Sequence, residues 1–106
     1  MGRIVLNVTA AAAFIVVMPM LALAAGDART GQELAERWCA SCHLVKPEQT
    51  QGAADAPSFM SIAERSGQDL EWLKTFLVEP HPPMPEMSLT REEIQNLIAY
   101  IDALQK

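Results

Sequence analysis

Two cysteines and a histidine fall within five consecutive residues, Cys39-Ala40-Ser41-Cys42-His43, and this C-x-x-C-H spacing constrains the chain more than any other feature. The sequence contains no other cysteine and only one other histidine, His81. A bond from both thiols to one group would fix this segment in place, so the remaining residues must fold around it.

The C-x-x-C-H spacing is the signature of covalent haem attachment. Thiols three positions apart can form thioethers to the two vinyl groups on one side of a porphyrin, and His43 can then bind the iron as the proximal ligand. We weighed zinc, a redox dithiol and an inert packed pair as alternatives. Structural zinc needs four ligands, and beyond these three residues the chain offers only His81 and carboxylates. A redox dithiol needs a neighbouring strand, and no strand-like run occurs nearby. The motif therefore predicts one covalent haem c, with Cys39 and Cys42 as its thioether residues.

The first residues have the pattern of a targeting segment. Arg3 precedes an uncharged, largely apolar run from Ile4 to Ala25, which contains the small-x-small pattern Ala22-Leu23-Ala24. This pattern predicts a signal peptide over residues 1–24, cleaved after Ala24. The alternative is an uncleaved membrane anchor, since the run is about long enough to span a bilayer.

Cleavage would leave residues 25–106, one domain with a small core. The formal net charge of −5 for all 106 residues becomes −6 when Arg3 is removed. Chains of this size often need a disulfide, a metal or another staple. Because both cysteines are committed to haem, we expect the haem to be that staple and the centre of the core.

The apolar periodicity predicts an all-α chain of about four short helices. Asp27 is a candidate N-cap for a first helix over about 28–40, which would carry both thiols. A polar loop over 44–56 precedes a second helix that begins at Pro57 and ends near residue 65. A third helix is predicted over about 68–78, ending before Pro80. Thr90-x-x-Glu93 is a capping box ahead of the last helix.

With the motif near its start and a methionine loop before a closing helix, the chain resembles a class I cytochrome c over residues 26–105. The resemblance implies the cytochrome c fold, in which a glycine such as Gly31 lies where the first and last helices cross and an aromatic such as Tyr100 packs over that crossing. Ala35 departs from the family, which commonly has a large aromatic there, so we expect a thinner crossing or one filled by Trp38. Because haem c is attached outside the energy-conserving membrane, the resemblance also implies a periplasmic protein.

The second iron ligand decides what such a haem can do, because a thioether closes the coordination sphere and raises the reduction potential. Met84 and Met87 are the candidates, in a loop rich in proline. The family ligand is typically a methionine followed by proline, which favours Met84; Met87 is the second choice and His81 the third. The family also uses a proline carbonyl to hold the proximal histidine, and Pro57 is the matching residue.

These features predict one-electron transfer rather than enzyme catalysis. The alternatives are a dedicated cytochrome subunit or electron acceptor of a specific dehydrogenase, and a haem sensor or enzyme with an open iron. The scattered basic residues give no nucleic-acid footprint. We expect redox proteins as electron donor and acceptor, and the acidic surface of this chain would attract partners that carry basic docking patches. We expect the chain itself to be a monomer or a subunit of a dehydrogenase complex.

Overall fold

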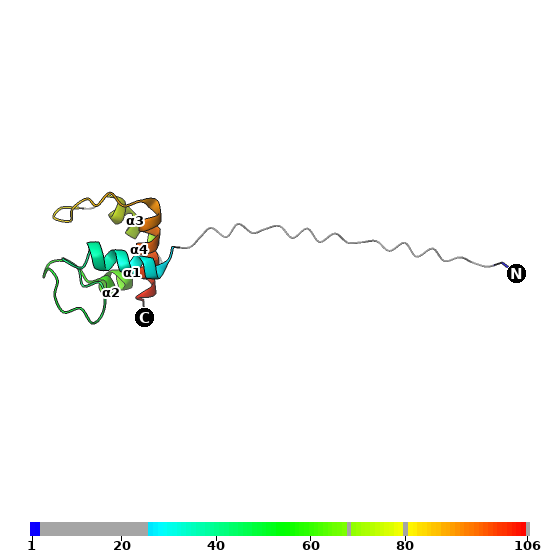
Figure 1. The fold of residues 1–106 in the computed structure, drawn as a ribbon, viewed down its shortest axis with the longest axis horizontal. Coiled ribbons are helices and arrows are strands. Elements are labelled where there is room, and N and C mark those ends of the chain that lie inside the picture. The colour runs from blue at the N-terminus through cyan, green and yellow to red at the C-terminus, as the bar shows by residue number, and fades with distance from the viewer. Residues whose placement is uncertain (3–25, 68, 80, 106) are drawn as a thin grey trace.

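The computed structural model describes residues 1–2, 26–67, 69–79 and 81–105 (Figure 1). Within these residues the chain is all-helical and contains no strand, which confirms the predicted fold class. The helices are α1 (Ala28–Trp38), α2 (Phe59–Ser66), α3 (Leu70–Val78) and α4 (Arg91–Ala103). The predicted cleavage site after Ala24 lies outside the described residues, as does nearly all of the predicted signal peptide. None of the helices in the described ranges is long and apolar enough to cross a membrane.

Side-chain caps begin the first and last helices as predicted. The Asp27 carboxylate accepts a hydrogen bond of 2.6 Å from the backbone N–H of Thr30. Thr90 and Glu93 form the reciprocal capping box, with bonds of 3.1 Å and 2.8 Å. These bonds satisfy N–H groups that have no partner inside the helix.

The first helix is shorter than predicted and does not contain the thiols. Cys39 is its C-cap, and the N–H groups of Cys42 and His43 both turn back to the Cys39 carbonyl, at 3.1 Å and 2.9 Å. The Ala40 N–H bonds to the Ala35 carbonyl, five positions back, so the helical ladder ends there. Both thiols therefore lie at the turn that follows α1.

The second and third helices begin later than predicted because a side chain caps each of them. Ser58 accepts a 3.1 Å bond from the Ser61 N–H, so Pro57 precedes the N-cap instead of opening α2. Asp69 accepts a 3.1 Å bond from the Trp72 N–H and starts α3 at Leu70. Both cap residues have short polar side chains that favour the position before a helix.

Helices α1 and α4 cross at a glycine, as the resemblance implied. A Cβ at Gly31 would lie 1.9 Å from the Asn96 carbonyl oxygen and 2.9 Å from the Tyr100 Cβ. The buried Asn96 side chain also accepts a 2.7 Å bond from the Asp27 N–H. Ala35 is fully buried, whereas Trp38 is 55% exposed, so Trp38 does not fill the crossing.

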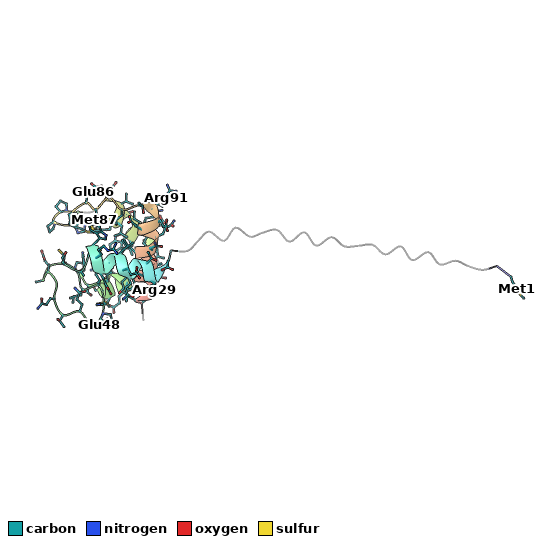
Figure 2. The ribbon with its side chains drawn as sticks, viewed as in Figure 1. Met1, Arg29, Glu48, Glu86, Met87 and Arg91 are labelled. Carbon is teal, nitrogen blue, oxygen red and sulfur yellow. The ribbon has the colours of Figure 1, made fainter. Side chains whose placement is uncertain are left out.

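The core is built from side chains of this crossing, of α2 and α3, and of the loop after the cysteine motif. That loop and the proline-rich loop before α4 lie on the same side of the crossing (Figure 1). The Tyr100 hydroxyl donates a buried 2.6 Å bond to the Val45 carbonyl, which ties the loop after the cysteine motif to α4. Glu48 in that loop and Met87 in the second loop lie at opposite edges of the helical body (Figure 2). The residues that share this core are Leu34, Ala35, Cys39, Val45, Phe59, Ala63, Leu73, Leu97, Tyr100 and Ile101.

Candidate haem-binding site

A cavity of about 360 Å³ brings the predicted site residues together. Its walls come from the turn after α1, from α2 and α3, and from the proline-rich loop before α4. The predicted site residues on its walls are Cys39, Cys42, His43, Pro57, Met84, Met87 and His81.

The two thiols differ in environment. Cys39 is buried, and this burial raises the pKa of its thiol to about 11, with a smaller contribution from the neighbouring Cys42. Cys42 is exposed, and the Ser41 hydroxyl donates to its sulfur at 3.9 Å. Neither sulfur is in a disulfide, so both are free to form thioethers.

The His43 ring is held from one side. Its Nδ1 lies 2.6 Å from the carbonyl oxygen of Pro57, fourteen positions along the chain. A carbonyl oxygen can only accept, so Nδ1 carries a proton and donates it, and in the neutral imidazole Nε2 then keeps its lone pair. The Phe59 ring packs at 5.5 Å between ring centroids. The imidazole is therefore in the tautomer that a metal ligand needs.

The loop after His43 is bonded to the motif along its length. The Ala53 N–H donates to the Cys42 carbonyl at 2.7 Å, and the Phe59 N–H donates to the Leu44 carbonyl at 2.8 Å. Gln49 bonds to the motif as well, although the sequence analysis did not single it out. A glutamine in a polar loop carries no spacing signal that would have identified it.

The proline-rich loop brings both methionines to the cavity. Met84 and Met87 are half-buried, and a turn bond of 2.8 Å joins the Met84 N–H to the His81 carbonyl. His81 is exposed and packs edge-on against Phe76, with 5.1 Å between ring centroids. Met87 also lines a second cavity, whereas Met84 lines only the first.

Aromatic side chains form much of the remaining wall. Trp72 and Phe76 pack at 4.6 Å between ring centroids, and 39% and 36% of their surfaces are exposed. Trp38 joins them at the end of α1. Arg65 on α2 also lines this space, and the sequence analysis did not identify it.

The residues around the cavity fit a haem c. Large apolar side chains with incomplete burial match a flat apolar macrocycle, and two free thiols lie beside a correctly protonated imidazole. Elsewhere among the described residues, no cluster of three or more His, Cys, Asp or Glu side chains could hold a metal ion.

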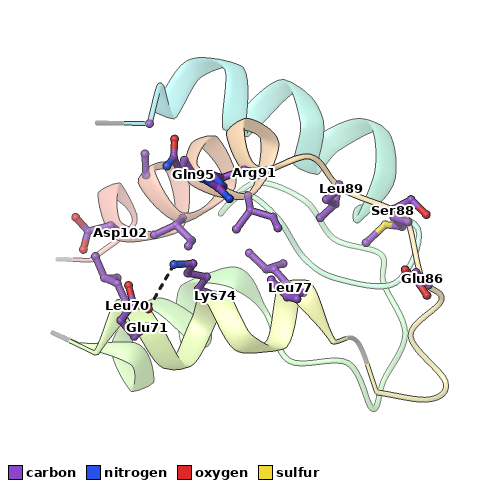
Figure 3. Close-up of a pocket in the computed structure, with 16 residues that line it drawn as sticks. Leu70, Glu71, Lys74, Leu77, Glu86, Ser88, Leu89, Arg91, Gln95 and Asp102 are labelled. Carbon is purple, nitrogen blue, oxygen red and sulfur yellow. Dashed lines mark ion pairs between the residues drawn. The ribbon is translucent and has the colours of Figure 1, made fainter. Parts of the chain in front are cut away.

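A larger cavity of about 990 Å³ lies between α3 and α4 (Figure 3). Its rim includes the ion pair of Lys74 and Glu71 at 3.5 Å, together with Arg91 and Asp102. Neither thiol nor His43 reaches it. It has no group suited to covalent attachment, so the smaller cavity is the candidate site.

Three other groups have shifted pKa values. A backbone N–H from Thr30 lowers the pKa of Asp27, and a hydrogen bond from Gln32 lowers that of Glu36, helped by Lys46 at 3.3 Å. Burial raises the pKa of Tyr100, which keeps its hydroxyl protonated as a donor.

Residues 26–101 match a protein family described as cytochrome c oxidase, cbb3-type, subunit III. Cytochrome c-552 of Bradyrhizobium diazoefficiens is 50% identical over 81 residues, which are 76% of this chain and 78% of that protein. No solved structure matches the chain.

Proposed function

The chain belongs to the small monohaem c-type cytochromes, which transfer electrons through a covalent haem c, and we propose that His43 and Met84 are the axial ligands of its iron. When bound, the haem supplies a one-electron redox centre. Cys39 and Cys42 would hold it covalently. The observation that carries this proposal is the 2.6 Å bond from His43 Nδ1 to the Pro57 carbonyl, in one cavity with both thiols and Met84.

Each protein group has a separate task at this site. The Pro57 carbonyl fixes the His43 tautomer and orientation, which also makes the imidazole a stronger donor. Met84 would supply a thioether sulfur from the proline-rich loop. Trp38, Trp72 and Phe76 would pack their apolar rings against the haem. This arrangement favours electron transfer over bond chemistry.

We further propose export to the periplasm with cleavage after Ala24. Support comes from the sequence pattern of residues 1–24 and from the attachment chemistry that the family shares. The donor and the acceptor would be redox proteins, and an acidic surface favours partners with basic docking patches. The first test is N-terminal sequencing of the protein from a periplasmic extract, for which we expect Ala25 as the first residue. Met1 retained in a membrane fraction would indicate an anchor instead.

A second candidate function is that of a subunit bound to one redox enzyme. The description of the matching family, which names an oxidase subunit, favours keeping this candidate. Gel filtration of a native extract separates the two. A diffusible carrier elutes near the mass of one chain, whereas a subunit elutes in a persistent complex.

The ligand proposal is tested by the optical spectrum of the exported protein together with its mass. We expect a sharp reduced α-band, a weak thioether-to-iron band in the oxidised form, and a mass equal to the mature chain plus one haem. A protein that carries haem but lacks the thioether band would contradict Met84 ligation. Binding of carbon monoxide by the reduced protein at neutral pH would instead indicate an open iron.

A further inference from the structure

The backbone of the cysteine motif and of the two residues after it is held by groups that lie further along the chain. Three of its carbonyls accept from distant groups: Cys42 from the Ala53 N–H, Leu44 from the Phe59 N–H and Val45 from the Tyr100 hydroxyl. Buried or crowded backbone polar groups need such partners. Two further carbonyls in this segment, those of Ala40 and His43, accept from one side chain, that of Gln49.

Both the nitrogen and the oxygen of the Gln49 side-chain amide form hydrogen bonds. Its Nε2 donates to the carbonyls of His43 at 2.9 Å, Ala40 at 3.0 Å and Gln51 at 2.8 Å, and its Oε1 accepts from the Val45 N–H at 3.0 Å. The reverse orientation of the amide would place an oxygen against these carbonyls, so the bonding pattern fixes the assignment. This one side chain therefore spans the backbone from Ala40 to Val45.

We propose that Gln49 is a positioning residue that clamps the motif backbone and so fixes His43, an inference that rests on the proposed role of His43 as an iron ligand. His43 then has two restraints. Its ring donates to the Pro57 carbonyl, and its own carbonyl accepts from Gln49. Val45 beyond it is fully buried, and side chains bind both its N–H and its carbonyl.

Removal of the clamp has a definite electronic consequence. If the His43 backbone can shift, the bond from its Nδ1 to the Pro57 carbonyl weakens. The imidazole then becomes a less basic ligand, which disfavours the oxidised iron more than the reduced iron. The reduction potential should therefore rise. A side chain that only contributed stability would lower the resistance to unfolding and leave the potential of the folded protein unchanged.

The test compares Gln49→Met with Gln51→Met in the haem-loaded protein. Methionine matches glutamine in length but can replace neither its N–H donors nor, except weakly, its acceptor. Gln51 is exposed, and only its backbone takes part in the clamp. We expect Gln49→Met to shift the potential upward and to speed exchange of the Val45 N–H by up to about tenfold. The Gln51→Met control should do neither.

A wild-type potential in Gln49→Met would overturn the clamp, even if that variant unfolds more easily. If Gln49→Met does not accumulate with haem, Gln49→Leu makes the same comparison, since it also loses both N–H donors and adds no charge that would itself shift the potential. The two proposals fail differently. Wild-type protein without haem, or without the thioether band, would contradict the proposed ligands, whereas unchanged potentials in the Gln49 variants would contradict only the clamp.

Discussion

At the scale of a residue, one backbone carbonyl, that of Pro57, orients the His43 ring through a hydrogen bond. The acceptor is a backbone carbonyl and not a titrating side chain, so this hydrogen bond selects the neutral tautomer with the proton on Nδ1. The proposed second ligand, a methionine sulfur, has no N–H through which it could be held in the same way. Its identity depends on which methionine the proline-rich loop presents.

We predict that Met84→Leu removes the thioether-to-iron band, lowers the reduction potential and lets the reduced protein bind carbon monoxide. Leucine keeps the volume and apolar character of methionine but has no sulfur to donate. The matched control is Met87→Leu, which should retain the band and the potential. Optical spectra and redox titration of both variants decide between them. The reverse pattern would make Met87 the ligand.

The C-x-x-C-H spacing predicted Cys39, Cys42 and His43 as site residues, because scarce residue types at fixed spacing carry a chemical meaning. Met84 and Pro57 were predicted from the family resemblance, and all five residues line one cavity. Gln49 and Arg65 had no such signal. Gln49 and Arg65 reach the site because a polar loop and an exposed face of α2 fold back toward the motif. No pattern in a single sequence predicts that folding.

At the scale of helices, α1 and α4 cross closely because Gly31 has no side chain. Backbone carbonyls cannot move aside as a flexible side-chain end can, and a Cβ at Gly31 would meet the Asn96 carbonyl oxygen at 1.9 Å. The crossing is therefore closer than any other residue would allow.

We predict that Gly31→Ala lowers the free energy of unfolding by about 1–3 kcal/mol, the usual cost of overpacking. In an exposed helix, the same change would stabilise by about 1 kcal/mol, so the sign of the effect is diagnostic. Denaturant unfolding of the haem-loaded protein measures it. Gln32→Ala, on the same helix, is the control and should have little effect. A stabilised Gly31→Ala would contradict the close crossing.

We also predict a pH-dependent contribution from the cap of α1. The Thr30 N–H lowers the folded-state pKa of Asp27, so its carboxylate stabilises the fold above the unfolded pKa of about 3.9. That contribution is lost as the pH falls through the lowered folded-state pKa. Asp27→Asn keeps the cap but cannot titrate. Its stability relative to wild type should rise as the pH falls below about 4, as measured by denaturant unfolding; a constant difference would contradict the cap.

Helix type and order could be predicted from the sequence, as could the starts of α1 and α4, but the starts of α2 and α3 and the end of α1 could not. The periodic apolar residues and the Thr90 capping box marked the last helix clearly. Ser58 and Asp69 begin α2 and α3 later than predicted, because the side chain of each accepts a backbone N–H of the first helical turn. The end of α1 was set by turn bonds to the Cys39 carbonyl, which no periodicity reports.

At the scale of the whole molecule, the candidate site is a cavity that reaches from the core to the surface. Buried core residues such as Phe59 and Leu73 also line it. A chain this short has few other apolar contacts with which to hold its loops in place. The group that fills the cavity should therefore determine whether the chain folds at all.

We predict that the double variant Cys39→Ser/Cys42→Ser, which cannot attach haem, loses most of its helical circular dichroism and its cooperative melting. Ser41→Ala keeps both thiols and serves as the control, with the wild-type signal expected. Far-UV spectra and thermal scans of the two proteins make the comparison. A haem-free double variant that melts cooperatively with full helical content would show that the polypeptide core is sufficient.

The chain enters the folded domain at Gly26, where a Cβ would lie 2.0 Å from the Gln95 carbonyl oxygen. The eleven residues of α1 separate that point from the cysteine turn by roughly 16 Å of helix. The two loops lie at the far end of the molecule from this entry (Figure 1). A tether joined ahead of Gly26, whether to an electrode or to a fused carrier, would therefore lie at the opposite end from the two loops, and the attached protein should still exchange electrons with partners in solution.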